Sequence, residues 1–190
     1  YDKAKFEVNA HNWIDMSDED YGVSLLNDCK YGHEVNEHKM ILTLLKAPIK
    51  PDPKSDRGDH YFTYSLYPHA ETWKKAKTLE RGLEINHPLV PVDIKSEGEL
   101  GADKSFITLA SDSMTLEAVK KCEEEDAYII RMVEKKGKSV DASVKFFAPL
   151  TYAAECDLIE RNDVPVEFDG DTISFHATPF EIKNYKVKIK

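Results

Sequence analysis

The chain has 190 residues, of which 41% are hydrophobic and 32% charged, so it can bury one sizeable core or two modest ones. Its formal net charge of −9 would repel a nucleic-acid backbone, and no basic stripe in the sequence offsets that charge. The longest apolar runs, such as residues 23–26, fall far short of the ~20 residues that a bilayer crossing needs.

Period-two alternation of apolar and polar residues predicts strands in the first half of the chain, each with one buried face. The expected strands cover residues 13–16, 21–26, 39–46 and 61–67. The prolines within residues 48–53 interrupt this pattern and predict a stiff, extended loop. One short amphipathic helix is expected to begin after Thr72, because apolar side chains recur there at helical spacing: Trp73, Ala76, Leu79 and Leu83.

Residues 86–101 lack sustained alternation and contain prolines and glycines, which is the composition of a connector between packed units. A domain boundary is therefore expected near Ser96, with residues 1–95 in one domain and residues 96–190 in the other. No internal repeat or low-complexity tract is visible in the sequence.

Beyond the connector, further alternating runs predict a meander of strands. These runs cover residues 106–109, 115–121, 128–134 and 138–147. Gly137 lies in the short polar stretch between the last two runs, and a glycine at positive φ is typical of a tight hairpin connection. The sequence Asp169-Gly170-Asp171 predicts a second hairpin in the same way.

The last predicted strand changes its phase of alternation. Phe180 and Ile182 share one phase, whereas Tyr185 and Val187 share the other. A β-bulge near Asn184 would reconcile the two phases. Together, the runs predict an all-β fold with one short helix.

Residue patterns that carry chemistry are absent from the sequence. The histidines never fall into a spacing, such as HExxH, that directs two imidazoles at one metal ion. His33 and His38 make the best pair, but they lie in a predicted turn, so surface placement is the favoured interpretation. The acidic runs at residues 18–20 and 123–126 are interpreted as solvated turns, because neighbouring like charges repel. No serine lies in a GxSxG elbow, and the Arg-Gly-Asp tripeptide at residues 57–59 is interpreted as a turn.

The cysteines and the first residue indicate the setting of the chain. Cys29, Cys122 and Cys156 are sparse and have no CxxC spacing, which favours reduced thiols over a disulfide framework. A cytoplasmic location is therefore expected. The sequence opens at Tyr1 without an initiating Met or a signal-peptide pattern, so we expect it to begin within a longer protein.

Several long strings in the chain resemble the C-terminal β-region of the family 38 α-mannosidases, which are glycoside hydrolases. The strings are WID at residues 13–15, YGVSLLNDCKYG at residues 21–32, and the stretch from residue 51 to residue 69 that ends in HYFTYSLYPH. Residues 178–188 look like the terminal strand of that family. The similarity thus reaches across the chain, although between residues 98 and 171 it is mainly a shared pattern.

The resemblance implies the end of a large antiparallel β-sandwich, up to about residue 95, followed by a small C-terminal β-sandwich. In that family an N-terminal α/β domain holds a zinc ion and an aspartate nucleophile, and it hydrolyses α-mannosides with retention through a covalent glycosyl-enzyme. None of those residues has a counterpart here, so the fragment alone is expected to be inactive and to hold no catalytic residue, metal or cofactor. The implied partners are the missing N-terminal catalytic domain of the same polypeptide, an α-mannoside that the parent enzyme binds, and further copies in a homo-oligomer.

Two polar, turn-rich loops are the candidates for the rim of the parent's substrate site or for an interdomain contact. They supply Asn27, Asp28, Lys30, Tyr31, Asp59 and His60. An equally open alternative is that these loops are structural corners only. A further one is that the chain is a stand-alone carbohydrate-binding or protein-interaction module, in which Trp73 or Tyr61 stacks on a sugar ring.

Overall fold

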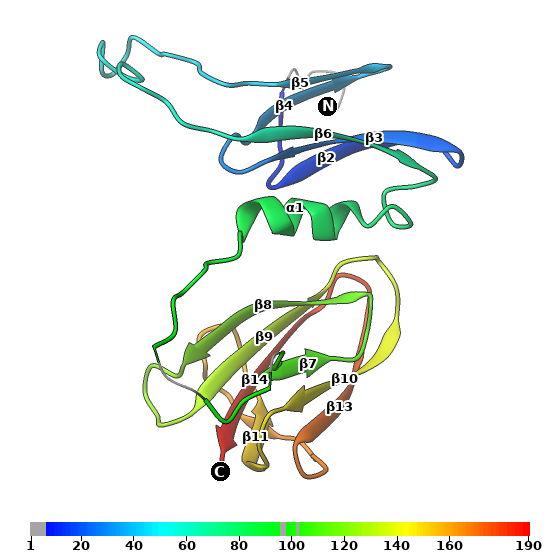
Figure 1. Ribbon diagram of the computed structural model, residues 1–190, viewed down its shortest axis with the longest axis vertical. Coiled ribbons are helices and arrows are strands. Elements are labelled where there is room, and N and C mark those ends of the chain that lie inside the picture. The colour runs from blue at the N-terminus through cyan, green and yellow to red at the C-terminus, as the bar shows by residue number, and fades with distance from the viewer. Residues whose placement is uncertain (1–6, 96–97, 102) are drawn as a thin grey trace. The chain divides into compact units, whose positions relative to one another are not determined.

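The structure is a computed structural model that describes residues 7–95, 98–101 and 103–190. It divides into two compact units, Tyr1–Ile94 and Lys95–Lys190. Antiparallel strands and a short helix form the regular structure of the described residues (Figure 1), which confirms the predicted all-β class. Ser96, near which the sequence predicts a domain boundary, lies outside the described residues. That residues 1–95 end a larger sandwich stays a prediction.

The first unit contains two three-stranded sheets, with strand orders β1-β4-β5 and β2-β3-β6. The strands are β1 (Val8–Asn9), β2 (Trp13–Ser17), β3 (Tyr21–Asn27), β4 (Gly32–Asn36), β5 (Lys39–Leu42) and β6 (Tyr64–Ala70). The helix α1 (Thr78–Asn86) packs against β2 and β3, as Figure 1 shows. β3 is the central strand of its sheet, and this places its end, Asn27, opposite Tyr64 of β6.

The sequence predicted β2 and β3 closely but misplaced the limits of β5 and β6. β5 ends at Leu42 rather than at residue 46, because only Thr43 continues its backbone bonding to β4. β6 begins at Tyr64 rather than at residue 61. The backbone of residues 61–63 bonds to the loop after β3 instead of to a neighbouring strand, which explains the later start.

The strand β4 was not predicted, and for this reason the burial of a histidine within it was also missed. His33 lies in β4 opposite Leu42 and is fully buried, so the predicted surface placement of this side chain is wrong. His38 does lie in the exposed turn between β4 and β5. The strand is short and mostly polar, and a period-two pattern is hard to detect over so few residues.

The helix begins later than the apolar spacing predicts, at Thr78. Lys77, immediately before it, has a φ of 58°, a left-handed conformation that a right-handed helix cannot contain. Residues 72–77 form turns instead. The helix approaches the sheet closely at Gly82, where an added Cβ would lie 2.9 Å from Cδ1 of Trp13.

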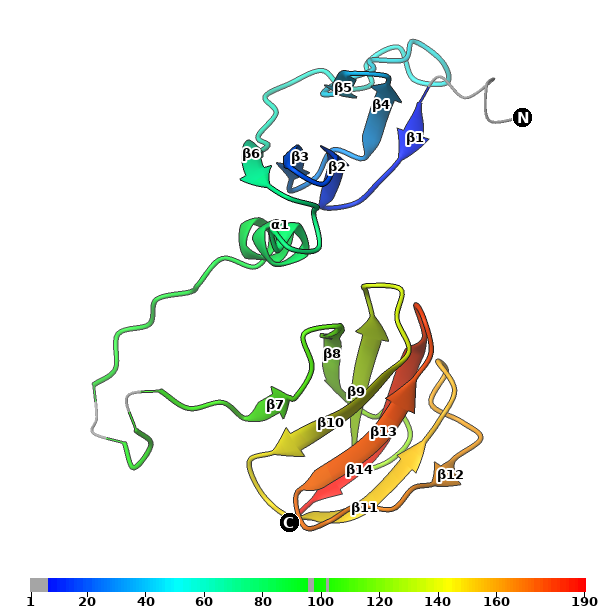
Figure 2. The same ribbon diagram turned by 90° about the vertical axis from the view of Figure 1, so that its right-hand side faces the viewer.

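The second unit is a β-sandwich of a three-stranded sheet, β13-β10-β7, and a five-stranded sheet, β12-β11-β14-β9-β8. Its strands are β7 (Ile107–Leu109), β8 (Met114–Lys121), β9 (Tyr128–Glu134), β10 (Val140–Phe146), β11 (Leu150–Glu155), β12 (Val164–Pro165), β13 (Thr172–Ala177) and β14 (Ile182–Ile189). The two sheets face each other in Figure 2 and share one core, with fully buried Met132, Val144, Ile173 and Val187.

The predicted hairpin at residues 135–138 is wrong, although Gly137 has the expected positive φ of 68°. β9 pairs with β8 and β14, whereas β10 pairs with β7 and β13, so this connection crosses from one sheet to the other. The buried carboxylate of Glu134 holds the crossing in place. It accepts the N–H groups of Lys136 and Gly137 at 2.8 Å and that of Phe180 at 3.0 Å.

The second predicted hairpin, at residues 169–171, is right only at its turn. Asp169 and Thr172 exchange both backbone hydrogen bonds, and Gly170 between them has a φ of 60°. Residues 166–168 do not form a strand, and β13 pairs with β10 instead. The turn residues therefore predicted local geometry correctly and strand pairing incorrectly.

The predicted bulge near Asn184 is also wrong. β14 pairs with β9 in continuous register from Ile182 to Val187, and the register shift of β14 lies instead against β11, between Leu150 and Tyr152. The alternation in β14 disappears because residues 184–187 are buried on both faces of the strand. One face meets the sandwich core, and polar loops cover the other.

Candidate functional site

The first candidate loop begins where β3 ends, at Asn27. This residue is fully buried, and its side-chain oxygen accepts the N–H of Lys30 at 2.8 Å, which closes the turn. Its carbonyl accepts a hydrogen bond from Asn86 of α1 at 3.0 Å, so the helix also holds the loop. The side-chain nitrogen of Asn27 is buried without a hydrogen-bond partner among the described residues. Asn27 therefore stabilises the conformation of the loop from a buried position and is not exposed to a ligand.

Asp28 joins the loop to the chain that follows the proline-rich segment. Its Oδ2 accepts the N–H of Thr63 at 2.9 Å, and its own N–H bonds to the carbonyl of Thr63 at 3.2 Å. Hydrogen bonds from the Cys29 thiol and the Thr63 N–H hold the pKa of the Asp28 carboxyl below its usual range. Asp28 is thus ionised at neutral pH and acts as an acceptor rather than as a general acid.

Lys30 and Tyr31 lie among aromatic side chains. The Lys30 ammonium lies 5.0 Å from the centre of the Phe62 ring, and Phe62 stacks on Tyr64 with ring centres 6.5 Å apart. Tyr31 is 46% exposed and packs against His11, with the two ring centres 4.6 Å apart. The result is a partly exposed aromatic and cationic surface.

The second candidate loop contributes its residues separately. His60 is exposed, and its Nε2 lies 2.8 Å from the carbonyl oxygen of Asp56. The Asp56 carboxylate accepts the N–H of Ala47 at 2.9 Å, which closes the base of the proline-rich loop. Asp59 is exposed, and the described part of the chain offers it no hydrogen bond or ion pair.

The structure therefore places the first loop against the segment that follows the second loop, and the hydrogen bonds and ring contacts go to that segment rather than to the predicted residues Asp59 and His60. Asp28 and Lys30 meet Thr63 and Phe62, which directly follow the second loop. The Asp28 carboxylate bonds to a backbone N–H, which any residue at position 63 other than proline would supply, so no residue pattern in the sequence identifies this partner.

The arrangement can accept hydrogen bonds, attract anions and stack on apolar rings. The Cys29 thiol lies beside the Asp28 carboxylate and donates a hydrogen bond to it, but this hydrogen bond raises the pKa of Cys29 and so keeps the thiol protonated rather than activating it as a nucleophile.

A buried polar network in the same unit was not predicted. Nε2 of His69 lies 2.8 Å from Oδ2 of Asp15, and the two side chains are 3% and 4% exposed. Nδ1 of His69 faces the carbonyl oxygen of Glu71 at 3.0 Å, so both ring nitrogens face acceptors. Burial alone would lower the pKa of His69, but these hydrogen bonds outweigh it and raise the pKa. Ser24 donates to the same Asp15 oxygen at 2.6 Å. The network links β2, β3 and β6 and has a structural role.

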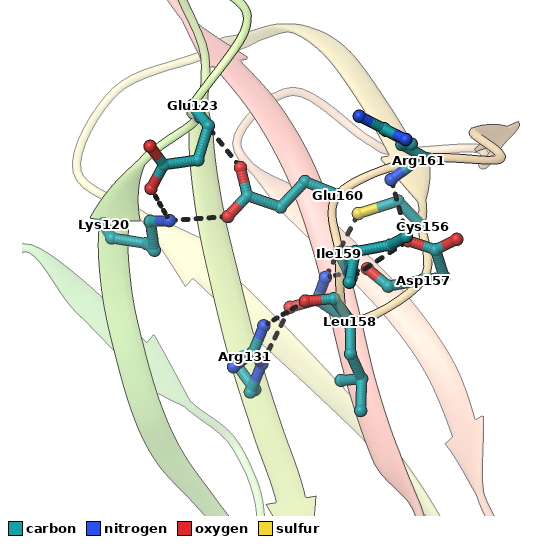
Figure 3. Close-up of polar contacts among 10 residues, drawn as sticks. Lys120, Glu123, Arg131, Cys156, Asp157, Leu158, Ile159, Glu160 and Arg161 are labelled. Atoms are coloured by element: carbon teal, nitrogen blue, oxygen red, sulfur yellow. Dashed lines mark hydrogen bonds and ion pairs between the residues drawn. The ribbon is translucent and has the colours of Figure 1, made fainter.

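The second unit has a polar cluster of its own (Figure 3). Residues 156–163, here called the strap, bond to strands of the five-stranded sheet. Glu160 accepts hydrogen bonds from the Lys120 ammonium at 2.6 Å and from the Glu123 N–H at 2.9 Å, and these bonds lower its pKa to about 2. Arg131 of β9 donates to the carbonyl of Leu158 at 3.2 Å. Each charge in this cluster has a partner, so the cluster fixes the strap and presents no free reactive group.

A metal centre finds no support in the described part of the chain. Within residues 7–95, 98–101 and 103–190 no three His, Cys, Asp or Glu side chains gather closely enough to hold an ion. The zinc that the resemblance implies for the whole enzyme therefore has no fitting ligand set among them. The described residues also include no helix with the length and apolar character needed to cross a membrane.

Two family models match the chain. The model "Glycosyl hydrolases family 38 C-terminal domain" matches residues 1–54. The model "Glycosyl hydrolases family 38 C-terminal beta sandwich domain" matches residues 113–185. The first match includes Asn27 to Tyr31, and the second covers most of the strands of the sandwich.

Curated relatives match nearly the whole chain. Alpha-mannosidase 2C1 of Homo sapiens is 37% identical over 166 residues, which is 86% of this chain and 16% of that protein. Alpha-mannosidase G of Dictyostelium discoideum is 32% identical over 196 residues, which is 98% of this chain and 18% of that protein. The chain thus spans less than a fifth of the length of these relatives.

Solved structures share the fold. A glycosyl hydrolase family 38 protein from Enterococcus faecalis superposes with a TM-score of 0.74 over 96% of this chain and 22% of its own, at 18% identity. An alpha-mannosidase from Enterococcus faecalis V583 gives a TM-score of 0.69 over 97% of this chain and 22% of its own, at 16% identity. With both family models matched and the fold shared, the chain belongs to the C-terminal β-region of glycosyl hydrolase family 38.

Proposed function

We propose that this chain is the non-catalytic C-terminal portion of an α-mannosidase, and that the remaining part of the parent hydrolyses α-mannosides with retention. The observation that carries the proposal is the match to relatives named alpha-mannosidase over 86% and 98% of the chain. Catalytic residues and zinc belong, in this proposal, to the missing N-terminal domain. The chain itself completes the fold and supports the substrate rim or the oligomer.

The candidate loops supply the rim in this proposal. Tyr31 and Asp59 are exposed and Lys30 is half-buried, and they offer aromatic and charged groups that make no hydrogen bond through their side chains among the described residues. Hydroxyl-rich substrates are held by charged hydrogen bonds and by stacking on aromatic faces. Asn27, Asp28 and His60 are positioning residues, since they bond mainly to the backbone of the two loops.

Kinetics of the full-length protein on an aryl α-mannoside test this proposal. Lys30→Met and Asp59→Asn remove charges without removing a hydrogen bond within the chain. Each should lower kcat/KM about tenfold, the effect of losing one charged hydrogen bond of roughly 1.5 kcal/mol. Lys39→Met is the matched control, because Lys39 lies beside the turn of the β4–β5 hairpin and its one ion pair among the described residues is with Glu34 at 3.3 Å. Unchanged kinetics in both variants would remove the rim role, and no turnover by the wild-type protein would remove the α-mannosidase assignment.

A second candidate function is carbohydrate binding by the chain itself. Tyr61 is 89% exposed, which favours a stacking role for this side chain. Trp73 is less suited, because it packs against Trp13 with ring centres 5.0 Å apart. Calorimetric titration of the chain with mannosides should show binding that Tyr61→Ala abolishes, and absence of heat in the wild type would exclude this function.

The cellular setting and assembly of the parent are part of the same proposal. All the cysteines are free thiols, with Cys122 and Cys156 buried, which supports a reducing, cytoplasmic location. The role in mannose metabolism rests, in this proposal, on the relatives named alpha-mannosidase. A homo-oligomer is proposed for the parent, and light scattering of the full-length protein measures it.

A further inference from the structure

The first unit ends in a segment whose apolar side chains lie in water. Residues 88–94 follow α1 as an extended trace in Figure 2. Leu89, Val90, Val92 and Ile94 are 98%, 81%, 77% and 86% exposed. Linkers of this length are normally polar, and clustered exposed aliphatic side chains indicate an interaction surface. The segment therefore has the composition of a buried strand and the exposure of a free linker.

The backbone of the segment is also unpaired. Among the described residues no backbone hydrogen bond involves residues 88–95. In an extended chain the side chains of Val90, Val92 and Ile94 share one face, and their N–H groups share one edge. Pro91 lacks an N–H, so the opposite edge misses a donor. Pro88 also lacks an N–H, but it stands at the first position of the segment, so from residue 89 to residue 94 one edge keeps all its donors and the other is interrupted at Pro91, which is the pattern of a strand at the border of a sheet.

The length of the relatives indicates what this strand pairs with. The chain spans 16% and 18% of two α-mannosidases that match nearly all of it, so most of a parent polypeptide lies outside these residues. A second copy of the chain is the alternative partner, and crosslinks between copies would identify it.

We propose that residues 88–94 add as an edge strand to a β-sheet in the remaining part of the parent polypeptide. The N–H groups of Val90, Val92 and Ile94 bond to that sheet, and their side chains cover its apolar face. This inference rests on the proposed function only in requiring a longer parent. It does not depend on which glycoside the parent hydrolyses.

Photo-crosslinking of the full-length protein tests the partner. Val92 is replaced by p-benzoylphenylalanine, and the crosslinked peptides are identified by mass spectrometry in a mixture of isotope-labelled and unlabelled protein. The expected product joins residue 92 to a residue outside the 190-residue stretch of the same molecule. The same probe at Asp126, whose side chain is 98% exposed, is the control and should give no such product. Crosslinks within the stretch, crosslinks between copies, or no crosslinks would overturn the proposal.

Two proline substitutions test which edge of the segment pairs with the partner sheet. Val92→Pro removes an N–H from the complete edge, whereas Asp93→Pro removes one from the interrupted edge. In the full-length protein, hydrogen exchange of the Val90 and Ile94 amides should accelerate at least tenfold in the first variant and stay slow in the second. Equal exchange in the two variants, or fast exchange in the wild type, would contradict the edge-strand geometry. Neither readout uses turnover, so a parent without mannosidase activity would leave the docking result intact.

Discussion

The substitution Asp15→Asn probes the buried histidine–carboxylate pair of the first unit. Asp15 and His69 are 4% and 3% exposed and 2.8 Å apart, so at pH 6, below the raised pKa of His69, the variant removes the counter-ion of a buried imidazolium. Breaking a buried ion pair by removing one partner costs about 3–5 kcal/mol. Asparagine keeps an oxygen that can accept one of the bonds, so the lower end, about 3 kcal/mol, is expected.

Urea unfolding of the chain followed by tryptophan fluorescence measures this loss. Both tryptophans, Trp13 and Trp73, lie in the first unit, so their emission reports on that unit alone. A loss of about 3 kcal/mol shifts the midpoint by on the order of 2 M urea, given the usual denaturant slope for small domains. Asp59→Asn, at an exposed aspartate without a partner in the described residues, is the control and should unfold like the wild type.

The pH dependence supplies the sharper test. The folded-state pKa of His69 is raised above its unfolded value of 6.5, so the pair contributes fully below pH 6.5. Its contribution is lost as the pH rises through the folded pKa. The difference between wild type and Asp15→Asn should therefore be largest near pH 6 and shrink towards pH 9. A loss below about 1 kcal/mol, or one that is equal at pH 6 and pH 9, would refute the charged-pair interpretation.

Three further substitutions test other contacts. Gly22→Ala should destabilise the first unit by about 2 kcal/mol, because the added Cβ would overlap Ser17 and His69, and an unchanged fluorescence midpoint would contradict it. Glu134→Gln should destabilise the second unit by about 2 kcal/mol, because a neutral oxygen replaces a carboxylate that accepts backbone N–H bonds; circular dichroism should detect this while tryptophan fluorescence stays unchanged. The ionised Glu160 stabilises the wild type above pH 4.5, and this stabilisation disappears as the pH falls towards about 2. Glu160→Gln should lack it, so equal stability of variant and wild type at pH 6 would argue against the strap bonds.

Strand positions followed from the sequence best where apolar and polar residues alternate, as in β10, whose Ala142, Val144 and Phe146 are buried while Asp141 and Lys145 are exposed. The limits of β9 match the predicted run at residues 128–134, and β8 differs by one residue at its start. Alternation fails in β14, because both of its faces are covered, and in β4, because it is short and mostly polar. The pattern reports exposure on each side of a strand, and it loses information when the two sides are alike.

The role of the candidate loops stays a prediction. The strings around Asn27 and His60 mark these loops through their resemblance to a family, and the structure places the first of them against residues 61–63. The contact between Asp28 and Thr63 was not predictable, because a backbone N–H carries no residue-specific signal. The His69–Asp15 pair was missed for a similar reason, since 54 positions separate two residues that meet only across the sheet.

The sequence by itself determined the β class, the left-handed turn at Gly137 and the family, because these depend on local pattern and on long matched strings. The tertiary structure decided which strands pair. Glu134 and Gly137 look like the start of a hairpin, yet the chain crosses there from one sheet to the other. A strand's side chains specify which face is buried, whereas its partner is chosen by the packing of the whole core, and only the folded chain contains that information.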